Sequence, residues 1–333
     1  MTVALRPGVW MLLRALTLLS TPHPDWPIEK RRAQDSADTA VLMKLLRPAP
    51  GRVVQAGYQV PTGGGEILVR CYVPEGTGPF PGHLYLHGGA FWAGSVADYD
   101  PLCRWYAAAA GCVVAAVDYD LAPQRKYPVQ VEQAYAALRW LAANAPDLGV
   151  RPDRLSVGGT SAGGSLAAAV ALMARDRGGP SLCFQLLEIP VTDCSTDYPS
   201  MREFGTGYLL TRQDLDEAFE LYLASPVQAQ EPYASPVRAA DLSGLPPALI
   251  LTSGCDPLRD QGEAYASRLR AAKVPATLRR YDGHVHSSTY LSRLFPSARR
   301  YLDDLATGLR AAHASADPEA AAGLTAEGVD GLP

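Results

Sequence analysis

The chain has 333 residues, of which 47% are hydrophobic, so it can bury the core of one large domain. Its 30 Lys and Arg residues and 34 Asp and Glu residues give a formal net charge of −4, with both signs mixed along the chain. Because no basic stripe or acidic tract stands out, the composition excludes nucleic acid as a partner and favours chemistry on small molecules.

The six cysteines are scattered, with no C-x-x-C pair and several inside apolar runs. They are Cys71, Cys103, Cys112, Cys183, Cys194 and Cys255. This pattern predicts buried free thiols, which suits a cytoplasmic protein in a reducing compartment.

The N-terminal stretch 9–19 is apolar, but Arg14 interrupts it and no small-residue cleavage site follows before Pro22. The stretch is too short to span a bilayer, so we expect no stable membrane insertion. We interpret it as an amphipathic helix that lies over an apolar surface, with membrane contact as the alternative.

Strand and helix patterns alternate along the rest of the chain. A Pro/Gly-rich join at 48–51 precedes strands at 53–60 and 67–73, which the turn at 62–65 connects as an antiparallel hairpin. Further strands are predicted at 83–86, 112–117, 182–189, 248–252 and 276–281, and helices at 99–110, 129–144, 260–272 and past 288. Another strand and helix are predicted directly before and after the turn at Ser161. Continuous apolar strands separated by helices predict an α/β fold, with a mostly parallel sheet covered on both faces.

Residues 193–227 break this alternation with aromatic and polar residues and a helix over 212–223. We expect this insertion to fold with residues 1–50 as a cap on a main domain of residues 51–313. The composition of residues 314–333, rich in Ala, Gly and Asp, predicts a disordered tail.

Residues 159–163 read Gly-Thr-Ser-Ala-Gly, the G-x-S-x-G pattern of a nucleophile elbow between a strand and a helix. Glycines on either side let the strand and helix approach, so that Ser161 occupies a strained turn at the helix N-terminus. Backbone N–H groups there favour developing negative charge. The alternative is a glycine turn that only packs a helix on a sheet, whereas a dinucleotide fingerprint or a P-loop does not fit the spacing.

A serine nucleophile needs a base, and the base needs an acid that orients it. With this type of elbow the chain order is serine, acid, histidine, which leaves His284 and His286 after the last predicted strand. In an extended loop both side chains lie on the same side, so the spacing does not choose between them.

For the acid, Asp256 follows the strand at 248–252, at an end that faces the crevice of an open parallel sheet. Asp260 fits the first turn of the next helix better. Asp193 and Asp197 also follow a strand but fall in the insertion, and they are second choices.

Residues 87–90 read His-Gly-Gly-Ala and follow the predicted strand that ends at Leu86. The adjacent Gly88 and Gly89 can turn their N–H groups inward as an oxyanion hole, with the N–H of Ala162 as a third donor. We interpret His87 as a residue that fixes this loop by hydrogen bonding.

These motifs together resemble the hormone-sensitive-lipase-like family of bacterial esterases, which has the α/β-hydrolase fold. The resemblance runs from about His83 to the last helix. It rests on segments 87–90, 118–123 (Asp-Tyr-Asp-Leu-Ala-Pro), 159–164 (Gly-Thr-Ser-Ala-Gly-Gly) and 256–260 (Asp-Pro-Leu-Arg-Asp), and on Tyr281, Gly283 and His286. It implies a helical cap, a homodimer built on a sheet edge, and the GTSAGG-type branch with threonine before the nucleophile.

The resemblance also implies a role for each candidate site residue. Ser161 is the implied nucleophile, His286 the base, Asp256 the acid, and the amides of Gly88, Gly89 and Ala162 the oxyanion hole. Nothing in the sequence implies a metal or an organic cofactor.

Four positions depart from the family pattern. Ala90 replaces a third glycine, and we expect the oxyanion hole to survive because its donors are the first two. Asp120 and Gln124 stand where the family has arginine and glutamate, so we expect a structural ion pair to be absent. Ser287 replaces a glycine after the histidine, which bears on the shape of that loop.

The sequence thus predicts a serine carboxylesterase that acts through an acyl-enzyme intermediate. Phe91, Trp92 and Tyr208 are predicted pocket walls, and they favour small or short-to-medium acyl esters without charge. The alternatives are hydrolysis of an amide, carbamate or lactone, and a non-catalytic ligand receptor on the same fold.

Overall fold

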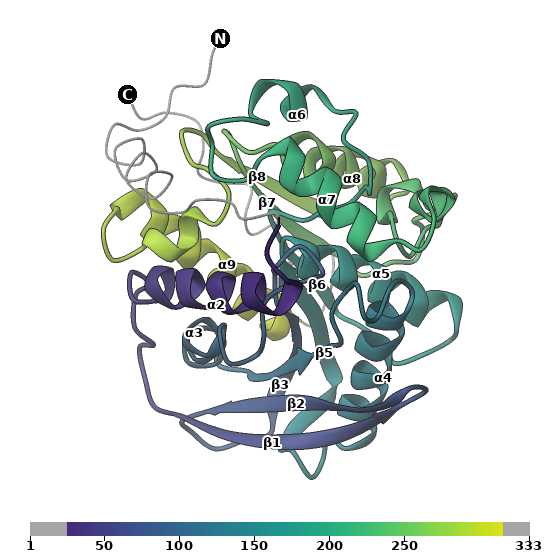
Figure 1. Ribbon diagram of the computed structural model, residues 1–333. Coiled ribbons are helices and arrows are strands. Elements are labelled where there is room, and N and C mark those ends of the chain that lie inside the picture. The colour runs from purple at the N-terminus through teal and green to yellow at the C-terminus, as the bar shows by residue number, and fades with distance from the viewer. Residues whose placement is uncertain (1–24, 316–333) are drawn as a thin grey trace.

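The computed structural model describes residues 25–315, which form one eight-stranded sheet flanked by helices (Figure 1). The strand order is β1-β2-β4-β3-β5-β6-β7-β8. The strands are β1 (Val53–Thr62), β2 (Gly65–Pro74), β3 (Phe80–Leu86), β4 (Val113–Asp118), β5 (Val150–Thr160), β6 (Phe184–Glu188), β7 (Ala248–Ser253) and β8 (Ala276–Tyr281). Strand β2 pairs antiparallel with β1 and β4, and all other neighbours pair parallel. The predicted mostly parallel sheet with an opening hairpin is confirmed.

Helices cover both faces of the sheet, as the sequence predicts. They are α2 (Ile28–Met43), α3 (Asp100–Ala110), α4 (Val129–Ala143), α5 (Ala162–Asp176), α6 (Pro199–Glu203), α7 (Arg212–Tyr222), α8 (Arg259–Ala271) and α9 (Pro296–Ala314). One buried cluster includes Leu138 of α4 and Leu166 of α5, and the other includes Trp105 of α3 and Leu305 of α9. Strands β3, β4, β6 and β7 contribute alternate residues to the two clusters, because successive side chains point to opposite faces.

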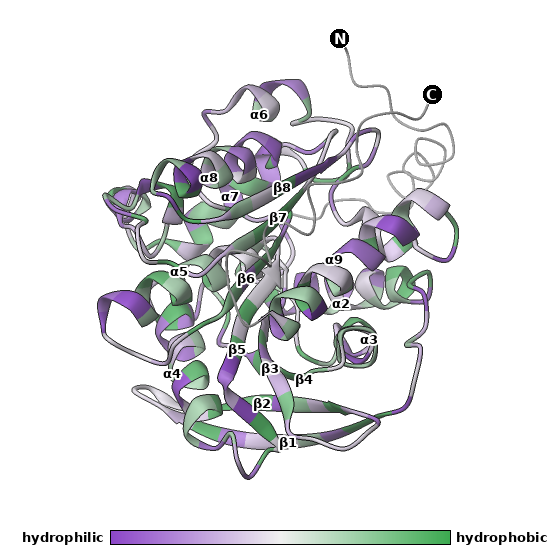
Figure 2. Cartoon of the chain, turned by 180° about the vertical axis from the view of Figure 1, so that it is seen from behind, coloured by the Kyte–Doolittle hydropathy of each residue, from purple (hydrophilic) through white to green (hydrophobic). Residues whose placement is uncertain are grey.

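Burial falls from the centre of the sheet to its edges. Strands β6 and β7 are buried along their whole length, whereas β1 is largely exposed and β8 half-buried. In Figure 2, β7 is mostly hydrophobic and β8 carries hydrophilic stretches. The continuous apolar runs therefore mark the strands that helices cover on both faces.

The connection between β6 and β7 departs from the simple alternation. It contains α6, α7 and two 3-10 turns, η1 (Pro226–Gln230) and η2 (Pro236–Arg238). Helix α7 begins with a capping box between Thr211 and Asp214, and it agrees with the helix predicted over 212–223. The final predicted helix starts as a 3-10 turn, η3 (Ser288–Leu291), before α9.

The helix predicted at 9–19 lies outside the described residues, as does almost all of the tail predicted from 314 onward. Among residues 25–315, no helix combines the length and hydropathy needed to cross a membrane.

Candidate active site

Ser161 occupies a sharp turn between β5, which ends at Thr160, and α5, which begins at Ala162. Its φ of 57° is strained for a residue with a Cβ, as the elbow pattern predicts. The turn leaves no room at the flanking glycines: a Cβ on Gly159 would lie 2.5 Å from the Leu86 carbonyl oxygen. The serine N–H donates to the Glu188 carbonyl at 2.9 Å, which fixes the turn to the neighbouring strand β6.

The structure joins three predicted residues in one hydrogen-bonded chain. His286 Nε2 lies 3.0 Å from Ser161 Oγ, and His286 Nδ1 lies 2.7 Å from Asp256 Oδ2. Because a carboxylate only accepts, Nδ1 carries the proton and donates to Asp256, which leaves Nε2 free to accept the serine hydroxyl proton. Asp256 is itself held by the backbone N–H of Leu258, which donates to Oδ1 at 2.8 Å.

The parallel strands bring these residues together although 125 positions separate Ser161 from His286. Strands β5, β6, β7 and β8 are neighbours that run in the same direction, so their carboxyl ends lie along one edge of the sheet. Ser161 follows β5 directly, Asp256 follows β7, and His286 follows β8. Ligands of open parallel sheets bind at this edge.

Comparison with known proteins assigns this arrangement to a family. A family profile described as alpha/beta hydrolase fold matches residues 83–289, which is more than half of the chain. The chain belongs to the α/β-hydrolase family. The carboxylic ester hydrolase LipN of Mycobacterium tuberculosis is 42% identical to it over 284 residues, covering 83% of this chain and 76% of LipN. Within the family, this protein is therefore a carboxylic ester hydrolase of the hormone-sensitive-lipase-like group.

Two other relatives support this placement among the hydrolases. Ethyl acetate hydrolase of Pseudomonas putida is 39% identical over 241 residues, covering 71% of this chain and 75% of its own. The solved structure of a hyperthermophilic esterase from Pyrobaculum calidifontis superposes with a TM-score of 0.86 at 35% identity, covering 94% of this chain and 100% of that one.

The alternative residues weighed from the hydrolase motifs have other contacts. His284 is buried with its ring edge-on to the rings of Tyr281 and Tyr301, at centroid distances of 5.9 and 6.0 Å. Asp260 lies in the first turn of α8, as expected, where its carboxylate accepts from the Ser200 N–H at 2.8 Å. Asp193 forms an ion pair of 2.9 Å with Arg238. The structure thus joins His286 and Asp256, and not these candidates, to Ser161.

The glycine loop after β3 is held by its carbonyl groups. The Tyr119 hydroxyl donates to the His87 carbonyl at 2.8 Å, the His87 ring donates to the Gly88 carbonyl at 2.7 Å, and the Ala93 N–H donates to the Gly89 carbonyl at 2.8 Å. In a trans peptide the N–H points opposite to the C=O, so fixing the carbonyls also fixes the N–H directions. Within residues 25–315, the N–H groups of Gly88, Gly89 and Ala162 donate no hydrogen bond to protein.

His87 has the loop-fixing contacts predicted for it. It is buried, its ring stacks on Tyr119 at a centroid distance of 4.2 Å, and burial lowers its pKa. A neutral ring whose Nδ1 donates to the loop has no role as a base for Ser161. The sequence interpretation of His87 agrees with this geometry.

The three predicted pocket walls lie in different environments. Phe91 is fully buried and stacks on Tyr222 of α7, with 3.8 Å between the ring centroids. Trp92 is half-buried, and the Arg31 guanidinium of α2 lies 4.7 Å from the centroid of its ring. Tyr208 is half-buried edge-on against Phe204 at 5.1 Å. The first two therefore connect the glycine loop to the helices α7 and α2.

The departures from the family pattern have local consequences. Ala90 and Ser287 adopt φ values of 52° and 61°, the left-handed region that glycine occupies without strain. Asp120 accepts from Gln133 Nε2 at 2.8 Å, and the Gln124 side-chain oxygen accepts from Arg32 of α2 at 2.6 Å. The last two side chains thus bind other partners in place of the family ion pair.

A second serine–histidine cluster lies in the sheet and is structural. Ser156 Oγ is 2.8 Å from His83 Nδ1 and 2.8 Å from His313 Nε2 of α9. Ser156 is fully buried, and burial lowers the pKa of His83 to about 3 and that of His313 to about 4. Among the described residues, no carboxylate binds either ring. These groups have neither the basicity nor the access that acyl transfer needs.

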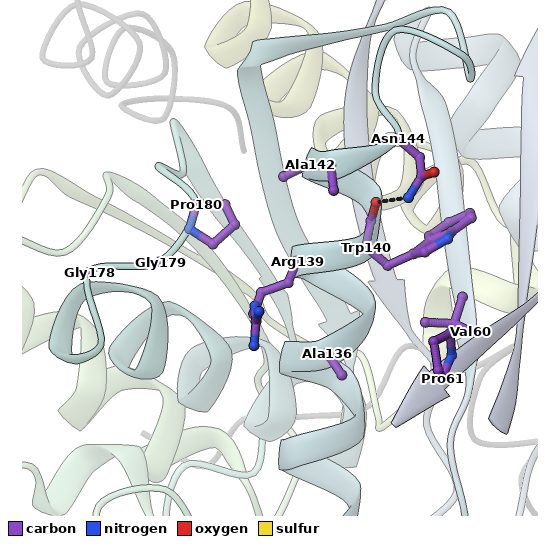
Figure 3. A pocket seen from close by; sticks show the side chains of 11 residues that line it. Val60, Pro61, Ala136, Arg139, Trp140, Ala142, Asn144, Gly178, Gly179 and Pro180 are labelled. Atoms are coloured by element: carbon purple, nitrogen blue, oxygen red, sulfur yellow. Dashed lines mark hydrogen bonds between the residues drawn. The ribbon is translucent and has the colours of Figure 1, made fainter. Parts of the chain in front are cut away.

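A hollow of about 730 Å³ lies beside α4 (Figure 3). Its walls include Val60, Pro61, Arg139, Trp140, Asn144 and Pro180. None of the predicted site residues lines it, so it has no part in the arrangement around Ser161.

Sequence reasoning missed Glu188, which lies directly behind the elbow. Its carboxylate accepts from Thr160 Oγ1 at 2.7 Å, which gives the threonine before Ser161 a physical role. In the sequence Glu188 is an acidic residue at the end of a continuous apolar strand, and that position alone does not tell a buried carboxylate from a solvated one.

Proposed function

We propose that Ser161, His286 and Asp256 are the catalytic triad of this carboxylesterase. The observation that carries the proposal is the chain of contacts at 3.0 and 2.7 Å from serine to histidine to aspartate. His286 Nε2 takes the hydroxyl proton as Ser161 Oγ attacks the ester carbonyl carbon. Asp256 holds the ring orientation and stabilises the imidazolium that forms.

The amides of Gly88, Gly89 and Ala162 are the proposed oxyanion hole. Their support is the fixed carbonyl groups of the glycine loop and the position of Ala162 at the first residue of α5. When the tetrahedral intermediate collapses, His286 gives its proton to the leaving alcohol and an acyl-serine remains. Water, deprotonated by the same histidine, then attacks the acyl carbon and releases the acid and the free serine.

We propose uncharged esters of short-to-medium acyl chains as substrates. The Phe91–Tyr222 stack supports this, because two buried rings fill space between the glycine loop and α7. The relative from Pseudomonas putida, named for its hydrolysis of ethyl acetate, points to the same substrate class. Hydrolysis of an amide, carbamate or lactone, and a non-catalytic ligand receptor, are the alternatives.

The proposed cap consists of residues 1–50 with the insertion 193–227, on a catalytic domain of residues 51–313. A bidentate ion pair supports it, since Arg31 of α2 contacts both Glu217 oxygens on α7, at 2.6 and 2.7 Å.

Three further proposals concern the protein as a whole. Thr160, the residue before Ser161, supports placement in the GTSAGG-type branch. Free thiols support a cytoplasmic location, and a sheet-edge homodimer stays a proposal from family resemblance.

The test is Ser161→Ala, assayed with p-nitrophenyl esters of two to twelve acyl carbons and, beside them, an anilide, a carbamate and a lactone. We expect kcat to fall by about 10⁶-fold, because the triad acts as a unit, and covalent labelling by an organophosphonate to disappear. Ser165→Ala is the matched control: this buried serine lies one turn further along α5, and the variant keeps both activity and labelling.

Full activity in the Ser161→Ala variant would refute the triad. A wild-type protein that binds the phosphonate reversibly, and turns over no ester, would favour the receptor. Faster turnover of an anilide, carbamate or lactone than of any ester in the panel would replace the proposed substrate class.

A further inference from the structure

Glu188, the last residue of β6, holds a position that the proposed triad does not use. It is 1% exposed and lies on the strand between β5 and β7, which carry the serine and the aspartate. Its backbone carbonyl accepts the Ser161 N–H at 2.9 Å. Main chain and side chain of this residue therefore both lie against the elbow.

The Glu188 carboxylate connects the two segments that hold nucleophile and base. Thr160 Oγ1, one residue before Ser161, donates to Oε2 at 2.7 Å. Thr289 Oγ1, three residues after His286, donates to Oε1 at 2.5 Å. Each carboxylate oxygen thus accepts from one of the two segments, and the Glu188 side chain bridges them.

The direction of the hydrogen bonds fits an ionised carboxylate. The Tyr85 hydroxyl lies 3.0 Å from Thr160 Oγ1, and since the threonine gives its proton to Glu188, the tyrosine donates to the threonine. The network therefore runs from tyrosine to threonine to carboxylate. An ionised carboxyl group accepts every bond that reaches it, and it needs no proton of its own.

Among residues 25–315, His286 is the one cationic group whose charge acts on Glu188. Five tyrosines from four elements and one loop feel its charge: Tyr85, Tyr99, Tyr106, Tyr290 and Tyr301. In the described part of the chain, no lysine or arginine forms an ion pair with it. Burial raises the pKa of Glu188, and the two threonine hydroxyls and the charge of His286 oppose that rise.

We propose that Glu188 is a positioning residue for ester hydrolysis. Its carboxylate fixes the separation of the elbow and the histidine loop, and its negative charge stabilises His286 in the protonated form that arises when Ser161 attacks. The inference rests on the proposed role of His286 as the base. A buried carboxylate without a cationic partner is costly, which accounts for the two hydroxyl groups that solvate it.

The decisive experiment is Glu188→Gln, with kcat/KM for a short acyl ester measured from pH 5 to 9. The amide keeps the shape and can still accept a hydrogen bond, but it lacks the charge. We expect kcat to fall by about tenfold and the low-pH limb of the profile to move to lower pH by about one unit. The direction follows because removal of a nearby negative charge destabilises the protonated imidazole, and a displacement of about one unit is the order that one nearby opposite charge produces.

Gln185→Met is the matched control, because Gln185 is a fully buried polar residue on the same strand whose amide donates to the Pro246 carbonyl at 2.8 Å. We expect this variant to be less stable, with the low-pH limb of its kcat/KM profile unchanged. A folded Glu188→Gln protein whose low-pH limb coincides with that of the wild type overturns the electrostatic role.

A pair of variants at Thr289 decides the positioning role even if Glu188→Gln does not fold. Thr289→Val removes the hydroxyl donor and should lower kcat about tenfold at unchanged KM. Thr289→Ser keeps a hydroxyl donor at this position and should keep kcat near the wild-type value. Equal kcat in the Val and Ser variants overturns the proposal. An active Ser161→Ala variant would instead refute the triad itself, so the two failures are distinguishable.

Discussion

Asp35 on α2 offers a test of how the N-terminal helix is held on the body of the protein. The next residue, Ser36, donates to Asp98, which also accepts from Ser95 Oγ at 2.6 Å. Burial raises the pKa of Asp35 from 3.8 to about 6, and the negative charges of Asp98 and Asp38 add to the rise. Replacing Asp35 with asparagine removes this titration and keeps the shape of the side chain.

The sign follows from the two pKa values. As pH rises from about 4 to about 6, the unfolded chain releases the Asp35 proton before the folded chain does, so the folded state loses stability through this group. The difference between 3.8 and about 6 corresponds to about 3 kcal/mol above pH 6. Asp35 is half-buried, and residual solvent screens its charge, so we expect about 1 to 2 kcal/mol.

Urea unfolding of wild type and Asp35→Asn, followed by tryptophan fluorescence from pH 4.5 to 8, measures this contribution. We expect the variant to be the more stable protein at pH 8, with its advantage shrinking by about 1 to 2 kcal/mol towards pH 4.5. Glu29→Gln is the control, since Glu29 is exposed on the same helix and its charge does not contribute to the raised pKa of Asp35, so its effect should not vary in this way. A stability difference between wild type and Asp35→Asn that stays constant from pH 4.5 to 8 refutes the reasoning.

Two backbone positions give further predictions. Ser287→Gly should raise the free energy of unfolding by about 0.5 to 1 kcal/mol, because φ at this residue is 61°, and a lower urea midpoint would contradict it. Gly89→Ala should lower kcat by about 10² to 10³-fold, since φ is 117° and a Cβ would collide with the Ala93 carbonyl, which displaces an oxyanion donor. Ala90→Gly is the control variant and should keep the wild-type kcat. A wild-type kcat in Gly89→Ala would show that the glycine loop does not supply the oxyanion hole.

The sequence predicts best those parts of the site that depend on residues adjacent in the chain. The run around Ser161 specifies strand, turn and helix within ten residues, and the structure has all three there. The choice between His284 and His286 was not local, because extended alternation gives both the same direction. In the structure the His284 ring lies edge-on to Tyr281 and Tyr301, whereas His286 Nδ1 lies 2.7 Å from Asp256 Oδ2.

Glu188 shows why the remainder of the site was not predictable. The threonines that bind it are 28 and 101 positions away in the chain, and only the pairing of β5 with β6 and the packing of η3 bring them to it. A residue that ends an apolar strand has no local feature that distinguishes a buried carboxylate from a solvated one. Contacts of this kind become visible only when the three-dimensional neighbours are known.

The distribution of the site over β5, β7 and β8 makes ester hydrolysis a reporter of chain assembly. During synthesis, Ser161 and its helix are complete long before residue 286 leaves the ribosome, and no fragment that ends earlier can hold the proposed base. The parallel pairing of β8 with β7 places Ala248 beside Ala276 across an intervening helix, and such nonlocal pairing forms more slowly than a helix. The return of activity on refolding should therefore lag behind the return of helical signal, and the interval between them measures how long the last strand takes to join the sheet.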